Sequence, residues 1–156
     1  MLKGDRQYVH WVSNRIAGGV IESGYGVVLS TSQPTGAATG QGINETAPVV
    51  VIGPASVIST TKFEGIAVNS AVSIDLAKQH LNYMRTDVPV GQPINILKHG
   101  WCWTNAVTGT PAAGDSAYLG ANGTFQNTSV GSLPAIGKFE TGKGPDGFLR
   151  ISINVA

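Results

Sequence analysis

Glycines punctuate the last third of the chain, where they separate one short apolar run from the next. Because they fall between the runs rather than inside them, they are spaced like the turns that join short antiparallel strands. The last run is the most regular, with apolar side chains at every second position: Leu149, Ile151, Ile153 and Val155. Such alternation predicts a strand with one buried face. The pattern as a whole predicts a mainly β fold, a small sandwich or barrel-like domain of short antiparallel strands.

Three further segments upstream carry recognisable periods. Residues 49–52 form a continuous β-branched run, which is typical of a strand buried on both faces, and residues 63–68 alternate. Between residues 73 and 85 the apolar side chains recur at the spacing of one helix face. We therefore expect one short helix at about 73–85.

Two alternating runs, at residues 94–96 and 101–103, are separated by a glycine and predict a hairpin. In the second run Cys102 lies between Trp101 and Trp103. As the single cysteine it cannot form an intrachain disulfide, and we expect a small buried side chain. The two tryptophans are expected in the core, and the alternative is an exposed platform on which a sugar could stack.

Two segments lack any period. Residues 1–14 predict an extended N-terminal arm that packs along its own domain or onto a neighbour. Residues 30–46 are rich in Gly, Ser and Thr and predict a long loop, which is either a contact that orders on binding or a tolerated insertion. The candidate contact residues in these two segments are Tyr8, His10, Trp11, Gln33, Thr35 and Asn44.

The composition limits the possible partners. The 156 residues are expected to form one domain, 1–156. Charged residues make up only 12% of the chain, against about 25% in an ordinary soluble domain. This favours either permanent association with other subunits or a neutral polar surface, and both readings stay open.

The distribution of charge limits the partners further. The net charge is only +1 and the ten basic residues are scattered along the chain, so nucleic acid is not an expected partner. No run is long enough for a membrane helix and no export signal is visible, so we expect no membrane partner and synthesis in the cytoplasm.

The motifs that could carry chemistry have simpler explanations. Residues 142–147 fit the G-x-G-x-x-G spelling of a dinucleotide site, but a strand rather than a helix follows, so a Pro-Asp-Gly turn is expected. Asp115 and Asp146, each beside a glycine, are expected to be turn residues. The three histidines form no metal-ligand cluster, and no pair of acids is close in sequence. We therefore predict no enzyme, with no catalytic, cofactor-binding or metal-binding residue.

The order of these elements resembles the structural cement proteins of tailed bacteriophage capsids. The resemblance covers residues 60–156, with a looser similarity at residues 15–19 and 26–28. It is carried by motifs that are each weak alone but occur in the family's order, at residues 63–68 (FEGIAV), 87–103 (DVPVGQPINILKHGWCW), 114–118 (GDSAY) and 136–139 (IGKF), followed by a last strand after Asp146-Gly147. The arm and the long loop match no motif of the family.

The resemblance implies a protein that is made in the host cytoplasm and binds the outer surface of the assembled head. There it would stabilise the shell by bridging neighbouring major capsid protein subunits. A homotrimer is favoured and a dimer is the alternative, and no cofactor is expected. Three other readings stay open: a β-sandwich binding module, including a carbohydrate-directed one, a tail or baseplate subunit, and an enzyme of unrecognised type.

Overall fold

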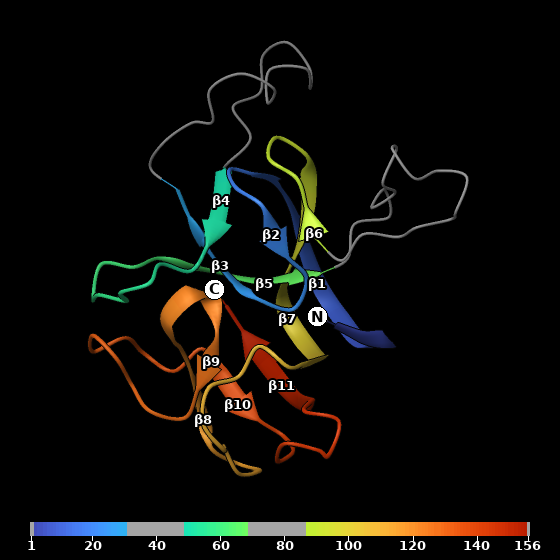
Figure 1. Ribbon diagram of the computed structural model, residues 1–156, viewed down its shortest axis with the longest axis vertical. Helices are drawn as coiled ribbons and strands as arrows, with labels where there is room; N and C mark the ends of the chain where they lie inside the picture. Colours follow the sequence, from blue (N-terminus) through green and yellow to red (C-terminus); the bar gives the residue numbers. More distant parts are fainter. Residues whose placement is uncertain (1, 31–48, 69–86, 156) are drawn as a thin grey trace.

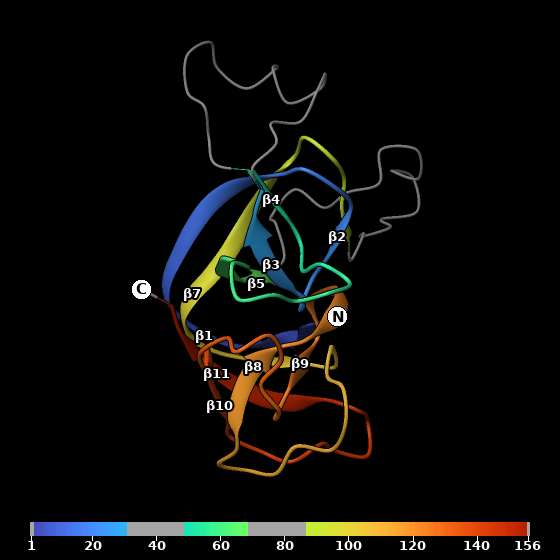
Figure 2. The ribbon, with the colours of Figure 1, turned by 90° about the vertical axis from the view of Figure 1, so that its left-hand side faces the viewer.

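The computed structural model describes residues 2–30, 49–68 and 87–155, with side chains from residue 15 onward. In this part of the chain the fold is mainly β, as predicted (Figure 1). A barrel-like sheet forms one half of the molecule and the strands of the C-terminal third form the other (Figures 1 and 2). The helix expected at about 73–85 lies outside the described residues, and so does the predicted loop apart from Ser30.

The first half is a ring of strands. Strand β1 pairs with β4 in parallel, β4 pairs with β3, β3 with β5 and β5 with β7, and β7 pairs with β1 again. The ring closes at Ile16, which has Val49 on one side and Pro93 on the other. The strands are β1 (Leu2–Ala17), β3 (Gly26–Leu29), β4 (Val49–Ile52), β5 (Phe63–Val68) and β7 (Pro93–Thr104).

The second half continues from β7. Strand β11 pairs with the C-terminal part of β7, and β10, β8 and β9 follow in that order. A short ribbon of β2 with β6 lies beside the ring. The bounds are β2 (Ile21–Glu22), β6 (Asp87–Val88), β8 (Ser116–Leu119), the 3-10 turn η3 (Ala121–Gly123), β9 (Phe125–Gln126), β10 (Gly137–Phe139) and β11 (Leu149–Asn154).

The hairpin predicted across residues 94–103 is wrong, because both runs belong to the single strand β7. Along one edge β7 pairs with β1. Along the other edge it pairs with β5 at residues 95–97 and with β11 at residues 99–104. Each run therefore pairs with other strands and not with its neighbour in sequence, and the glycine that suggested a turn lies inside a strand.

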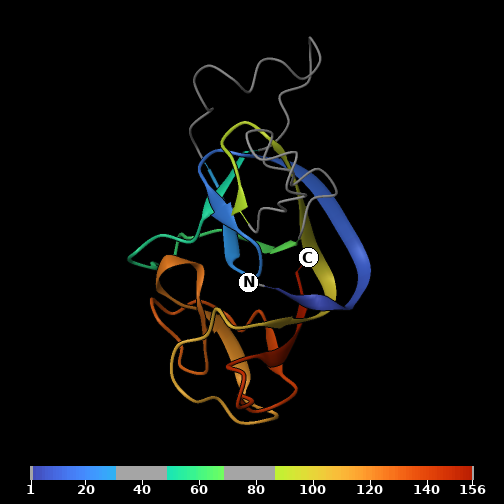
Figure 3. The ribbon, with the colours of Figure 1, turned by 45° about the vertical axis from the view of Figure 1, so that its right-hand side comes forward.

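The segment predicted as an extended arm is extended, but it forms the long strand β1 on its own domain (Figure 3). It runs antiparallel to β7, from Leu2 opposite Thr104 to Ile16 opposite Pro93. The register shifts between Leu2 and Gln7 and again on both sides of Trp11. Such irregularities interrupt the two-residue alternation of side chains, which explains why the sequence shows no strand period here.

Strands β5 and β7 separate two apolar cores. In β5 the neighbours Ile66 and Ala67 are both fully buried but belong to different cores. In β7 the neighbours Ile96 and Leu97 are divided in the same way. The ring encloses one core: Ala17, Ile21, Val27, Val50, Ala67, Val88, Ile94 and Ile96. The other core lies between the ring and the C-terminal strands: Ile66, Val68, Leu97, Cys102, Ala117, Phe125, Ile136, Phe139, Leu149, Ile151 and Ile153.

The burial of the 101–103 run follows from this arrangement. Cys102 is fully buried, as predicted. The expectation that the tryptophans are core residues is wrong, because Trp101 and Trp103 are only half-buried. Successive residues of a strand point to opposite faces, so the residue that fills the core turns both of its neighbours away.

Gly65 in β5 allows a close approach to strand β7. Its φ is +151°, and a Cβ placed on it would lie 2.3 Å from the carbonyl oxygen of Leu97. No side chain fits without moving the β7 backbone. We expect Gly65→Ala to lower the free energy of unfolding by about 2–4 kcal/mol, measured by urea denaturation. The matched control is Gly19→Ala, because a Cβ there meets no atom within 4 Å. Equal unfolding midpoints for the two variants would contradict this role of Gly65.

Candidate functional site

A shallow groove of about 540 Å³ crosses the outer face of the second half of the molecule. Strands β7, β11, β10 and β8, which lie side by side in Figure 1, all contribute to it. The residues that line it are His99, Gly100, Trp101, Ser116, Ala135, Ile136, Gly137, Lys138, Ser152, Ile153 and Asn154.

Strand register places four of these residues in one row across the sheet. Trp101 lies opposite Ser152, Ser152 opposite Lys138, and Lys138 opposite Ser116. Directly opposite residues of paired strands project on the same face. None of the four belongs to the buried core, and Lys138 and Ser116 are exposed. An indole, an ammonium and two hydroxyls therefore line one band of the groove.

The neighbouring row alternates with the first along the same strands and turns toward the core. Gly100, Ile153, Gly137 and Ala117 lie opposite one another in the same strands, and Ile153 and Ala117 are buried. A Cβ on Gly137 would lie 1.9 Å from the Ser152 carbonyl oxygen. The absence of a side chain at this position lets β10 approach β11 closely.

Arg150 fixes the position of the Trp101 ring. Its guanidinium carbon lies 5.0 Å from the ring centroid, and the same guanidinium forms an ion pair with Glu140. A cation over the face of an indole is attracted by the negative charge of the ring face. Because Glu140 compensates Arg150 and no carboxylate lines the groove among the described residues, the charge presented there is the positive charge of Lys138.

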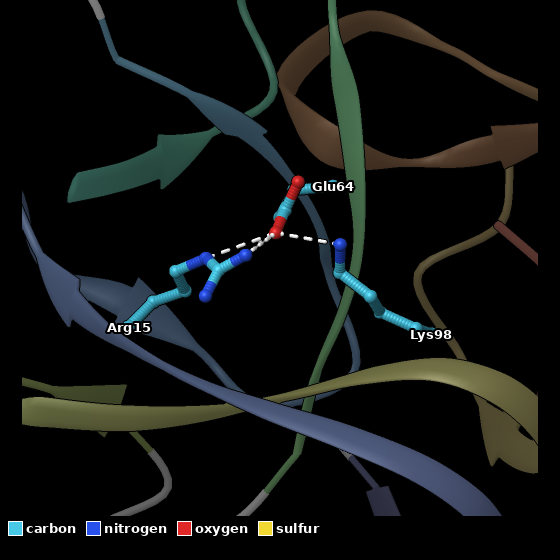
Figure 4. A network of polar contacts seen from close by, with 3 residues as sticks. All are labelled: Arg15, Glu64 and Lys98. Carbon is cyan, nitrogen blue, oxygen red and sulfur yellow. Dashed lines mark hydrogen bonds and ion pairs between the residues drawn. The ribbon is translucent and has the colours of Figure 1, made fainter. Parts of the chain in front are cut away.

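A second polar cluster joins three strands of the ring. Glu64 of β5 accepts a hydrogen bond from Arg15 Nε of β1 at 2.9 Å and lies 2.9 Å from Lys98 Nζ of β7, both through its Oε1 atom (Figure 4). A second Arg15 nitrogen, Nη2, donates to the same oxygen. Glu64 is 5% exposed and Lys98 is 8% exposed. None of the three lines the groove, and the arrangement of one carboxylate between two cations fits a structural tie.

The contact residues predicted from the sequence do not line the groove in the described part of the chain. Tyr8, His10 and Trp11 lie on β1, with Tyr8 opposite Trp101, Trp11 opposite His99 and His10 at a shift in register. The backbone of the predicted arm is therefore next to the part of β7 that lines the groove. Gln33, Thr35 and Asn44 lie outside the described residues.

Sequence reasoning did not select Lys138 as a binding residue, because nothing near it in sequence marks it as one. Its importance depends on the register of β10 between β11 and β8, which places it beside Ser152 and Ser116. The sequence did offer Trp101 as a platform for a sugar. Because Trp101 alternates with the buried Cys102 in a strand, its side chain points away from the core.

The expected turns are confirmed. In the 142–147 segment the Gly147 amide donates to the Gly144 carbonyl at 2.9 Å, Phe148 N donates to Asp146 Oδ1 at 3.2 Å, and β11 follows. Hydrogen bonds from the Ala112 amide and the Asn127 side chain hold the pKa of the Asp115 carboxyl below its usual value. Both aspartates therefore cap local backbone.

The described part of the chain contains neither a metal-binding cluster nor a membrane-spanning helix. No group of three or more His, Cys, Asp and Glu residues there is arranged to hold a metal ion. Among the same residues, no helix has the length and apolar character required to cross a membrane.

The profile of one protein family matches residues 6–154. Its description is structural cement protein (E217 gp24/Pam3 gp6). This chain belongs to the structural cement protein family. It is a structural protein of bacteriophage capsids, and the resemblance seen in residues 60–156 is confirmed and extends toward the N-terminus.

This cement protein was also compared with curated proteins and with solved structures. A search of curated proteins gives no match. Among solved structures the fold is similar to the crystal structure of the head fiber gp8.5 N base in bacteriophage phi29, with a TM-score of 0.48 and 11% sequence identity over 92% of this chain and 93% of that chain.

Removing the shared carboxylate of the polar cluster should destabilise the cement protein. We expect Glu64→Gln to lower the free energy of unfolding by about 3–5 kcal/mol, because it takes the negative charge from between a buried lysine and a partly buried arginine. Glu140→Gln is the matched control, since it removes the same charge from a partly exposed pair and should cost about 1 kcal/mol or less. Chemical denaturation of both variants measures the difference. A Glu64→Gln variant no less stable than the control would contradict the structural role.

The thiol of Cys102 should be inert in the folded protein. Burial raises its pKa to about 12, so that at pH 8 only about one thiol in ten thousand is a reactive thiolate. We expect no reaction of the native protein with Ellman's reagent at pH 8 over an hour. In guanidinium chloride the same sample should react completely at its single cysteine. Equal rates in the two conditions would show that the thiol is accessible.

Proposed function

We propose that this cement protein binds the outer surface of the assembled head and stabilises it by bridging neighbouring major capsid protein subunits. The observation that carries the proposal is the family match over residues 6–154. The low charge of the chain, 12% of residues, supports it, because depletion of charge is a property of protein surfaces that become buried in interfaces. Bridging of capsid subunits requires complementary surfaces and many copies, and it requires no catalysis.

The proposal includes self-association, with a homotrimer favoured over a dimer. In the described residues, β1 pairs with β4 only at Ile16 and Ala17, so the rest of that edge has no strand partner there. A free strand edge is a template for pairing with another chain. A symmetric oligomer that engages several capsid subunits at once gains avidity without a single tight interface.

The proposed contacts with the capsid or with other copies are Tyr8, His10 and Trp11 on β1 and Gln33, Thr35 and Asn44 in the 30–46 segment. The position of β1 supports the first three, because this strand pairs with the part of β7 that lines the groove.

A carbohydrate-binding module is the second candidate. The observation that favours it is the half-buried Trp101 in a groove with the hydroxyls of Ser116 and Ser152 and the amide of Asn154. An aromatic face with nearby hydrogen-bonding groups suits a sugar ring. A deep pocket, which a catalytic site would favour, is not present among the described residues at this position, since the groove is open and shallow.

The number of copies per particle tests the proposal. In purified virions of the encoding phage, quantitative peptide mass spectrometry should find this chain in hundreds of copies, near parity with the major capsid protein. A few copies per particle would instead indicate a tail, baseplate or neck subunit. Absence from the particle would contradict a role in the virion and favour the binding module.

A further inference from the structure

We propose that the groove across β7, β11, β10 and β8 is the docking site for an extended segment of the major capsid protein that carries an Asp or Glu carboxylate and an apolar side chain. This inference rests on the proposed function and names the chemistry of its partner.

The carboxylate follows from charge complementarity. Lys138 is exposed at the centre of the row that runs from Trp101 through Ser152 to Ser116. Among the described residues no Asp or Glu lines the groove. An ammonium flanked by two hydroxyls offers donors to a carboxylate on both sides of the charge.

The apolar side chain follows from a second hollow that continues the groove. This hollow of about 220 Å³ shares Ala135, Ile136 and Asn154 with the groove. Its other lining residues are mainly apolar: Thr61, Phe63, Leu133, Pro134 and Val155. A segment that places its carboxylate at Lys138 can therefore place a neighbouring apolar side chain in the hollow, where that side chain is removed from water.

Trp101 lies at one end of the row and offers an aromatic contact to the bound segment. Arg150 lies over its ring and is itself held by Glu140, so the indole is positioned before a partner arrives. Tryptophan is enriched among the residues that dominate binding energy, and a pre-positioned side chain loses little entropy on binding. A protein segment is favoured over a glycan because the unbalanced positive charge and the adjoining apolar hollow match a peptide with mixed side chains.

The test compares charge reversal at two lysines of the same β10–β11 hairpin. Lys138 lies in the groove, whereas Lys143 lies in the exposed turn that joins the two strands. The full-length wild type, K138E, K143E and K138R are added to purified expanded heads that lack this chain, and bound protein is quantified after sedimentation. Thermal unfolding confirms that all four proteins are folded.

We expect K138E to weaken head binding at least tenfold, whereas K143E and K138R stay within about twofold of the wild type. Wild-type binding should also weaken as salt is raised, because the contact includes an exposed charge. Equal binding by K138E and K143E would overturn the inference and leave the proposed function intact. Failure of the wild type to bind heads would instead contradict the proposed function itself.

Two further outcomes would assign the groove to another occupant and so overturn the inference. If K138E, but not K143E, changes the sedimentation coefficient of the isolated protein, the groove is a contact between copies of this chain. If oligosaccharides shift the tryptophan fluorescence of the wild type and compete with heads, the groove is a glycan site. An unchanged sedimentation coefficient and no response to oligosaccharides are the results that we expect.

Discussion

Strand β7 pairs with three other strands, and both halves of the molecule are built on it. One edge pairs with β1, and the other pairs first with β5 and then with β11. The same strand therefore closes the ring and begins the C-terminal sheet. In its N-terminal part the neighbours Ile96 and Leu97 are buried in different cores. The groove exists because β11 joins β7 where Trp101 turns outward.

Several charged residues of the described part of the chain have identifiable structural roles. Glu64 is buried between Arg15 and Lys98, and it joins three strands of the ring. Arg150 and Glu140 pair beside Trp101 and hold its ring in place. Lys138 is left as the charge that the groove presents. A surface with so little charge can meet a neighbouring subunit with a low cost of desolvation, so that one exposed ammonium in a groove can contribute to specificity.

The sequence was a good guide wherever neighbouring residues decide the structure. It predicted the mainly β fold, the final strand with its buried face, the burial of Cys102 and the turns at Asp115 and Asp146. It predicted that the segment of β1 is extended but not that it is a strand, because register shifts hide the alternation, and it failed in β7, where a glycine inside a strand resembled a turn. It also failed for Trp101 and Trp103, whose size suggested the core. The predicted contacts of the arm lie beside the groove, but its central residue, Lys138, was not selected.

Local chemistry follows from the order of residues alone, because alternation fixes which face of a strand is apolar and the order of the motifs indicates the family. Which strands are neighbours is a property of the folded chain. The row from Trp101 to Ser116 spans four strands, and the Glu64 cluster spans three that are distant in sequence. Pairing between strands is selected by the combined burial of two cores, which depends on all strands at once. No short stretch of sequence contains that information, and the candidate site is built from it.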